Sequence, residues 1–132
     1  MTLRQLQALI KKMPFNQSLG IRVVRKHDDG VTIQCLVRGN LRNSAGVLHG
    51  GVTATLADAA VGIAIFNHFG GARQATTVEM KINYFLPVKS GKVTARAHLL
   101  RVGSTLCVGR ADLFDAKKRL AGAALVTYML LP

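Results

Sequence analysis

The residues best suited to chemistry in this chain are the turn His49-Gly50-Gly51 and an aspartate, Asp58, eight residues after Gly50. Asp58 is the only acidic residue in an otherwise apolar segment, residues 52–69. A buried carboxylate is costly unless it has a partner or a role. Backbone N–H groups at a helix start favour developing negative charge. A carboxylate and such a donor are a minimal set for attacking a carbonyl and holding its oxyanion, so an enzyme is the leading interpretation.

Each of these features also has a structural interpretation. Asp58 is also compatible with a structural carboxylate bonded to a hydroxyl such as that of Thr55, or to the backbone of a partner chain. His49 on its own is typical of an ordinary loop histidine. The pair Gly50-Gly51 on its own indicates only a turn.

Four polar residues near these features are candidates for contacts with a substrate. Asn43 and His49 flank the turn and offer hydrogen bonds to a carbonyl or a leaving group. Thr76 and Thr77 open the next extended segment, and their hydroxyls are suited to orienting a water molecule. Threonines at such positions are most often plain strand residues, so these two remain open.

Length and composition indicate one globular domain over residues 1–132. Hydrophobic residues make up 49% of the chain and charged residues 18%. The 18 Lys and Arg outnumber the 6 Asp and Glu, and the formal charge of +12 favours an anionic partner. These basic residues are scattered, aromatic residues are only 5% and Trp is absent, which argues against dedicated nucleic-acid binding.

The sequence carries no metal, signal-peptide or membrane-span pattern. Its four histidines lack partners at ligand spacing, so no metal site is expected. Cys35 and Cys107 lie in apolar alternating stretches and are expected to be buried, reduced thiols. The amphipathic start lacks a signal core, and Asp58 interrupts the longest apolar stretch. We expect a soluble, cytoplasmic protein without a membrane segment.

A short helix and a hairpin are predicted ahead of the glycine turn. Apolar residues at helical spacing run over residues 3–13, with Thr2 as the cap and Pro14 as the end. Two alternating stretches then flank the turn Asp28-Asp29-Gly30. Small and polar residues over 40–48 predict a loop.

A long helix and a run of strands are predicted after the loop. The helix covers about residues 50–69 and ends at Gly70-Gly71. The pattern then has period two and predicts three or four strands, over residues 75–87, 91–103, 104–114 and 119–131. Short turns make the sheet antiparallel. One sheet covers only one side of a helix that is apolar nearly all round, so a second copy of the chain is expected on the other side.

The spacing of Gly50 and Asp58 gives a second argument for a dimer. Eight helical residues span roughly 12 Å, whereas a reacting carbonyl must lie about 3 Å from both groups. Two antiparallel helices across a two-fold axis could place Gly50 of one chain near Asp58 of the other. This holds only if the two residues share a function. Asp58 would act as a general base or as a nucleophile, and the sequence leaves both open.

Three segments, residues 43–52, 56–58 and 77–84, resemble the hotdog-fold acyl-CoA thioesterases of the PaaI-like group. The pattern N-x5-HGG-x6-D is fairly specific to that group, and the resemblance covers nearly the whole chain, least over the first 40 residues. It implies an α+β hotdog fold, in which a five- to six-stranded antiparallel sheet wraps a long central helix behind a short N-terminal helix. It also implies dimers joined edge to edge, usually paired into a dimer of dimers.

The resemblance also implies roles for individual residues. The N–H of Gly50 corresponds to the oxyanion donor, and Asp58 of the partner chain to the catalytic carboxylate. Asn43 and His49 correspond to residues that contact the thioester, and Thr77 to the residue that helps to hold the water.

Further roles follow less directly. Thr76 is an alternative to Thr77, because the loop before these residues varies in length. Arg101 and Ser104, in the turn of residues 101–104, are candidates for contacts with coenzyme A. Coenzyme A is part of the acyl-CoA substrate, and its phosphates suit a chain of charge +12. No metal or redox cofactor is implied.

Two rival functions remain beside thioester hydrolysis. A hotdog hydratase or dehydratase pairs an acid with a catalytic His at other spacings. A non-catalytic acyl-CoA sensor has no need to keep both Asp58 and the glycine turn. The acyl group cannot be identified from the sequence, although Ala45, Ala54 and Ala75 are candidate pocket residues.

Overall fold

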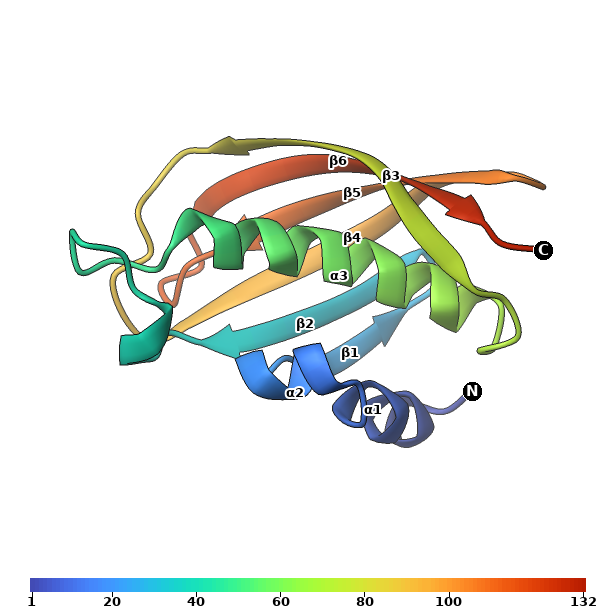
Figure 1. The fold of residues 1–132 in the computed structure, drawn as a ribbon, viewed down its shortest axis with the longest axis horizontal. Coiled ribbons are helices and arrows are strands. Elements are labelled where there is room, and N and C mark those ends of the chain that lie inside the picture. The colour runs from blue at the N-terminus through green and yellow to red at the C-terminus, as the bar shows by residue number, and fades with distance from the viewer.

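The computed structural model describes residues 1–132 and shows a curved antiparallel sheet wrapped around one long helix (Figure 1). This is the α+β hotdog architecture that the sequence predicts. The helices are α1 (Leu3–Lys11), α2 (Pro14–Leu19) and α3 (Gly50–His68), with a 3-10 turn at Gly39–Leu41. The strands are β1 (Arg22–His27), β2 (Gly30–Leu36), β3 (Ala75–Tyr84), β4 (Lys92–Val102), β5 (Leu106–Phe114) and β6 (Leu120–Leu130).

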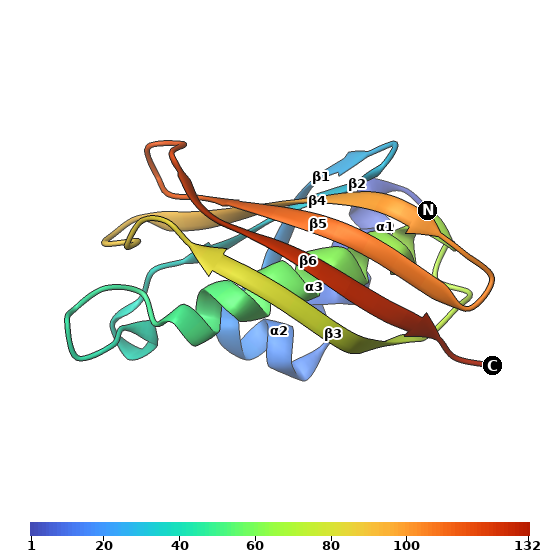
Figure 2. The same cartoon turned by 90° about the horizontal axis from the view of Figure 1, so that it is seen from above.

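The six strands lie in the order β1-β2-β4-β5-β6-β3, and every pair is antiparallel. The strand that directly follows the long helix therefore lies at one edge, beside the last strand of the chain (Figure 2). Its other edge has no partner strand within the chain. β1 forms the opposite edge, and α1 lies beside it.

The inner face of α3 forms the centre of the hydrophobic core. Leu56, Ala57, Ala60 and Val61 are all fully buried against the strands. Two alanines in this set keep the helix surface flat, which lets the sheet approach closely. α3 is long and apolar enough to cross a membrane. The buried core helix of a folded domain can meet the same two criteria, so this is weak evidence for a membrane span.

The N-terminal segment confirms one prediction and corrects another. Thr2 caps α1, because its hydroxyl accepts from the N–H of Gln5 at 3.1 Å while its own N–H donates to the Gln5 side chain. Pro14 does not end this helix, which already stops at Lys11. It is instead the first residue of α2, where the N–H that proline lacks would have no partner within the helix.

The other predicted elements are confirmed. The hairpin turns where Asp28-Asp29-Gly30 predicts it, the long helix begins at Gly50, and all four later strands form. Cys35 and Cys107 are both buried and free.

Candidate active site

α3 begins at a histidine cap that leaves one backbone donor unused. Nδ1 of His49 accepts from the N–H of Gly51 at 2.9 Å. A Cβ on Gly51 would lie 2.9 Å from that same nitrogen, so the cap requires glycine there. The N–H of Gly50, in contrast, has no acceptor within the chain. It points outward at the positive end of the helix dipole.

Nothing inside the chain explains why residue 50 is a glycine. Its φ is not in the left-handed region, and a Cβ there would only reach ordinary contact with Tyr84, at 3.5 Å. The Tyr84 hydroxyl donates to the carbonyl of Gly50 at 2.9 Å and so fixes the first turn of α3. A glycine that the fold of its own chain does not require leaves space for another molecule to approach the backbone closely.

Asp58 lies at the middle of α3 and is held from the sheet by two hydroxyls. Thr77 Oγ1 on β3 and the Tyr128 hydroxyl on β6 both donate to Oδ1 of Asp58, each at 2.7 Å. The Tyr128 hydroxyl also lies 2.7 Å from the Asp58 carbonyl. Oδ2 of Asp58 has no partner in the chain, so one oxygen is anchored and the other is left free.

The β3–β6 register explains why Thr77 rather than Thr76 reaches the carboxylate. Thr77 pairs with Tyr128, so both side chains point from neighbouring strands toward α3. Thr76 pairs with Met129, and successive residues of a strand point to opposite faces. A bulge directly after Thr77 then shifts the register.

Tyr128 is a site residue that the sequence reading misses. Its side chain is buried, and burial raises the pKa of its hydroxyl far above the ordinary value; the Asp58 carboxylate raises it further. Tyr128 therefore keeps its proton and remains a hydrogen-bond donor to the Asp58 carboxylate. The sequence feature that could have indicated Tyr128 is a hydroxyl at an inward position of the last alternating stretch. Tyr84, the only other tyrosine, was not predicted as a site residue either.

Thr55 has a different partner from the one considered for it. Its hydroxyl donates to the carbonyl of Gly51 at 2.8 Å, one turn earlier in α3. Asp58 is thus anchored by hydroxyls of the sheet and not by its own helix.

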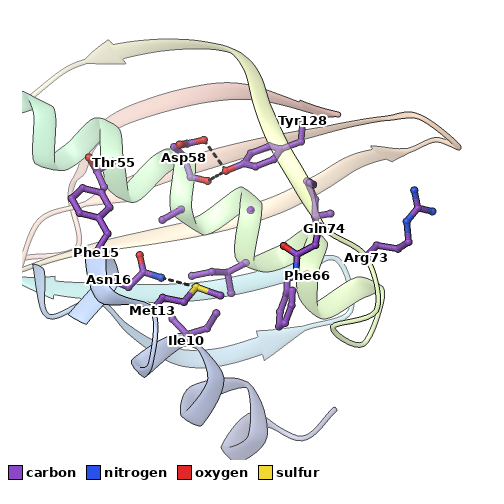
Figure 3. Close-up of a pocket in the computed structure, with 15 residues that line it drawn as sticks. Ile10, Met13, Phe15, Asn16, Thr55, Asp58, Phe66, Arg73, Gln74 and Tyr128 are labelled. Atoms are coloured by element: carbon purple, nitrogen blue, oxygen red, sulfur yellow. Dashed lines mark hydrogen bonds between the residues drawn. The ribbon is translucent and has the colours of Figure 1, made fainter. Parts of the chain in front are cut away.

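Asp58 and Gly50 line different cavities of the single chain. The Asp58 cavity, about 270 Å³, lies between α3, the N-terminal segment and the start of β3 (Figure 3). Ala75 is among the residues that line it, whereas Ala45 and Ala54 are not. The Gly50 cavity, about 310 Å³, is bordered by the loop before α3 and by the segment after β3. One chain therefore presents two separate half-sites.

Asn43 belongs to the Gly50 half-site. Its side-chain oxygen accepts from the N–H groups of Ala45 and Val47, which stabilises the turn, and its amide nitrogen has no partner. Asn43 also lines the cavity that contains Gly50.

Arg101 and Ser104 are not brought to either half-site. Both are exposed, at or beyond the end of β4. The β4–β5 turn lies at the end of the sheet opposite the start of α3 (Figures 1 and 2).

Comparisons with known proteins give a consistent picture. Residues 45–121 match the model of the thioesterase superfamily. Acyl-coenzyme A thioesterase 13 from Homo sapiens is 34% identical over 110 residues, which are 82% of this chain and 78% of the human protein. The medium/long-chain acyl-CoA thioesterase YigI from Escherichia coli is 26% identical over 141 residues, covering 94% of this chain and 90% of that protein.

Solved structures agree in fold. A thioesterase from Haemophilus influenzae superposes with a TM-score of 0.91 at 27% identity, covering 99% of this chain and 91% of that one. Zebrafish thioesterase superfamily member 2 gives a TM-score of 0.89 at 28% identity, covering 99% of both chains.

Proposed function

Because this chain belongs to the thioesterase superfamily and is a thioester hydrolase, we propose that Asp58 and the N–H of Gly50 act together on an acyl-CoA. The anchored carboxylate carries the proposal. Two donors hold Oδ1 of Asp58, and Oδ2 is free beside a cavity with apolar walls.

The reaction is the hydrolysis of an acyl or aroyl thioester to the free acid and coenzyme A. Water adds to the thioester carbon while Asp58 takes its proton, or Asp58 adds first and gives a mixed anhydride that water then hydrolyses. In both routes the carbonyl oxygen becomes negative, and the N–H of Gly50 stabilises it. When this oxyanion collapses, the C–S bond breaks and the coenzyme A thiolate leaves; in the anhydride route this happens as the anhydride forms and before water attacks. Thr77 and Tyr128 orient the carboxylate; Asn43 and His49 are suited to positioning the thioester.

A composite site between two chains would bring the Gly50 half-site of one chain together with the Asp58 half-site of the other. Gly50 and Asp58 of one helix are roughly 12 Å apart, too far for one carbonyl to meet both. The free edge of β3 supports pairing with a second copy, because a long unpaired edge invites another strand. Exposed apolar side chains follow the same segment: Val78, Tyr84, Phe85 and Leu86. We propose a homodimer joined along β3, further paired into a dimer of dimers.

Coenzyme A itself would bind beside this composite site, where its thioester reaches Asp58 and the N–H of Gly50. The net charge of +12 attracts its phosphates, and Arg101 and Ser104 remain candidate contacts if the partner chain brings them close. No cofactor besides the coenzyme A of the substrate enters the proposed reaction. We propose that the protein acts in the cytoplasm.

A mixing experiment tests both the chemistry and the composite site. Release of free thiol from acyl-CoA is measured for the wild type, for Asp58→Asn and for Gly50→Pro. Each variant alone is expected to be nearly inactive. After the two variants are unfolded together and refolded, mixed dimers carry one intact site each, so about a quarter of wild-type activity should return.

The outcomes separate the parts of the proposal. No recovery after mixing would place Gly50 and Asp58 in the same chain's site. Full activity of Asp58→Asn would remove the catalytic role of Asp58. Tight acyl-CoA binding without any hydrolysis by the wild type would identify a binding protein instead.

A further inference from the structure

The cavity beside Asp58 is closed on one side by the N-terminal segment (Figure 3). One wall is the half-exposed face of α3, which runs from Thr55 past Asp58 to Phe66. The facing wall is formed by residues of α1, α2 and the link between them: Ile10, Met13, Phe15 and Asn16. The catalytic carboxylate and the wall opposite it therefore come from parts of the chain that are far apart in sequence.

This N-terminal wall is fixed to the body of the protein. Leu6 and Ile10 of α1 are fully buried, and the Gln7 side chain donates to the Val23 carbonyl of β1 at 2.8 Å. A wall anchored in this way has one position against α3, so it limits what fits beside it.

Met13 is the side chain of this wall best placed to limit the space between the wall and α3, and so how far along α3 an acyl chain can extend. The amide of the buried Asn16 contacts its sulfur at 3.4 Å and orients the side chain. Met13 is also 39% exposed, so a different side chain there would not disturb the core. Phe15, at 63% exposure, lies at the outer rim beside Thr55.

The length of α3 along one wall of the cavity and the residues that line it indicate a straight apolar chain. The helical stretch from Asp58 to Phe66 spans roughly 12 Å, and at about 1.3 Å per carbon this accommodates about eight to ten carbons. Arg73 is the only charged residue lining the cavity besides Asp58. Gly62, halfway along, adds no side chain, and a Cβ there would come within 2.6 Å of the Tyr128 hydroxyl.

We propose that Met13 determines the length of the acyl chain that is hydrolysed, with a preference for straight chains of about eight to ten carbons. This inference rests on the proposed function and deepens it. The acyl chain lies between Met13 and α3, with its thioester carbon at Asp58.

The test compares kcat/KM for butyryl-, octanoyl-, dodecanoyl- and palmitoyl-CoA in the wild type, Met13→Trp and Met13→Ala. Met13→Trp narrows the cavity and should lower kcat/KM for octanoyl-CoA at least about tenfold more than kcat/KM for butyryl-CoA, because the longer chain loses more buried methylenes. Met13→Ala should shift the optimum to longer chains. Leu9→Ala is the matched control: Leu9 is 42% exposed on α1 and does not line the cavity.

Parallel chain-length profiles for all four proteins would overturn the role of Met13 and leave the proposed function standing. A wild type that prefers butyryl-CoA would overturn the preferred length. Absence of thiol release by the wild type from every acyl-CoA would instead overturn the proposed function itself. Cooperative urea unfolding with a midpoint near that of the wild type shows that a variant is folded.

Discussion

Tyr128 and Asp58 are joined by a 2.7 Å hydrogen bond that links the last strand of the sheet to the middle of the long helix. The bond connects residues 70 positions apart in the sequence. It holds Oδ1 of the carboxylate, whereas Oδ2 has no partner in the chain, and Asp58 lines the cavity. The orientation of the proposed catalytic group thus depends on the packing of β6 against α3.

Tyr128→Phe removes this hydrogen bond and leaves the ring in place. A hydrogen bond to a charged group contributes about 1.5–3 kcal/mol, so we expect a loss of stability in this range and a drop in kcat. Urea unfolding and steady-state kinetics measure the two effects. A variant with unchanged kcat but lower stability would show that Tyr128 is only structural.

Thr77→Val tests the second donor, with Thr76→Val as its matched control. Both changes keep a β-branched shape in the same strand, but only Thr77 donates to Asp58. We expect kcat to fall roughly tenfold or more for Thr77→Val and to stay near the wild-type value for Thr76→Val. Equal effects of the two changes would contradict the assignment of Thr77.

Gly50→Pro removes the proposed oxyanion donor with little effect on the helix. Position 50 is the first residue of α3, where proline is well tolerated, and His49 before it already has the extended backbone that proline requires. We expect kcat to fall about 100-fold or more, as for other lost oxyanion donors. Gly50→Ala, which keeps the N–H, is the control and should retain more activity. Equal activity of the two variants would argue against an N–H role.

Stability at low pH should depend on Asp29. Its hydrogen bond to Arg96, together with that to His98, lowers the pKa of Asp29 from 3.8 to about 2. A carboxyl with a lowered folded-state pKa stabilises the fold above pH 3.8 and loses this contribution as the pH falls toward about 2. Asp29→Asn should therefore unfold at lower urea than the wild type at neutral pH, with the difference shrinking through this window. A difference independent of pH would contradict the ion pair.

The two thiols should not interfere with assays that follow release of coenzyme A. Cys35 and Cys107 are almost completely buried, and burial raises the pKa of both thiols. We expect dithiobis(nitrobenzoate), a reagent that reacts with thiols, to label the two cysteines only after urea unfolds the chain. Rapid labelling of the native protein would show that one of these positions opens in solution.

Most of the fold follows from local patterns in the sequence. Helical spacing before Pro14, the turn at Asp28-Asp29-Gly30 and the change to period two after residue 75 mark elements that the structure contains. The prediction that Pro14 ends the first helix was wrong, because proline is compatible both with the end of one helix and with the first turn of the next. The local sequence does not distinguish these two cases.

The partners of Asp58 could not be predicted in the same way. They depend on which strands become neighbours and in which register, and β3 pairs with a strand that starts about 35 residues after it ends. Thr77 was a candidate because its hydroxyl opens the strand after the helix and because it corresponds to a residue of the family pattern. Tyr128 was not, since only the sheet order brings it there.

The position of β3 has a consequence for the chain as it emerges from the ribosome. β3 is made directly after α3, but its only partner strand within the chain is β6, which is made after β4 and β5. Until β6 emerges, Asp58 lacks Tyr128, and β3 has no strand to hold Thr77 in register. Because synthesis proceeds from the N-terminus, the proposed catalytic centre is completed only after β6, the strand that follows β1 to β5 in the sequence, has been made.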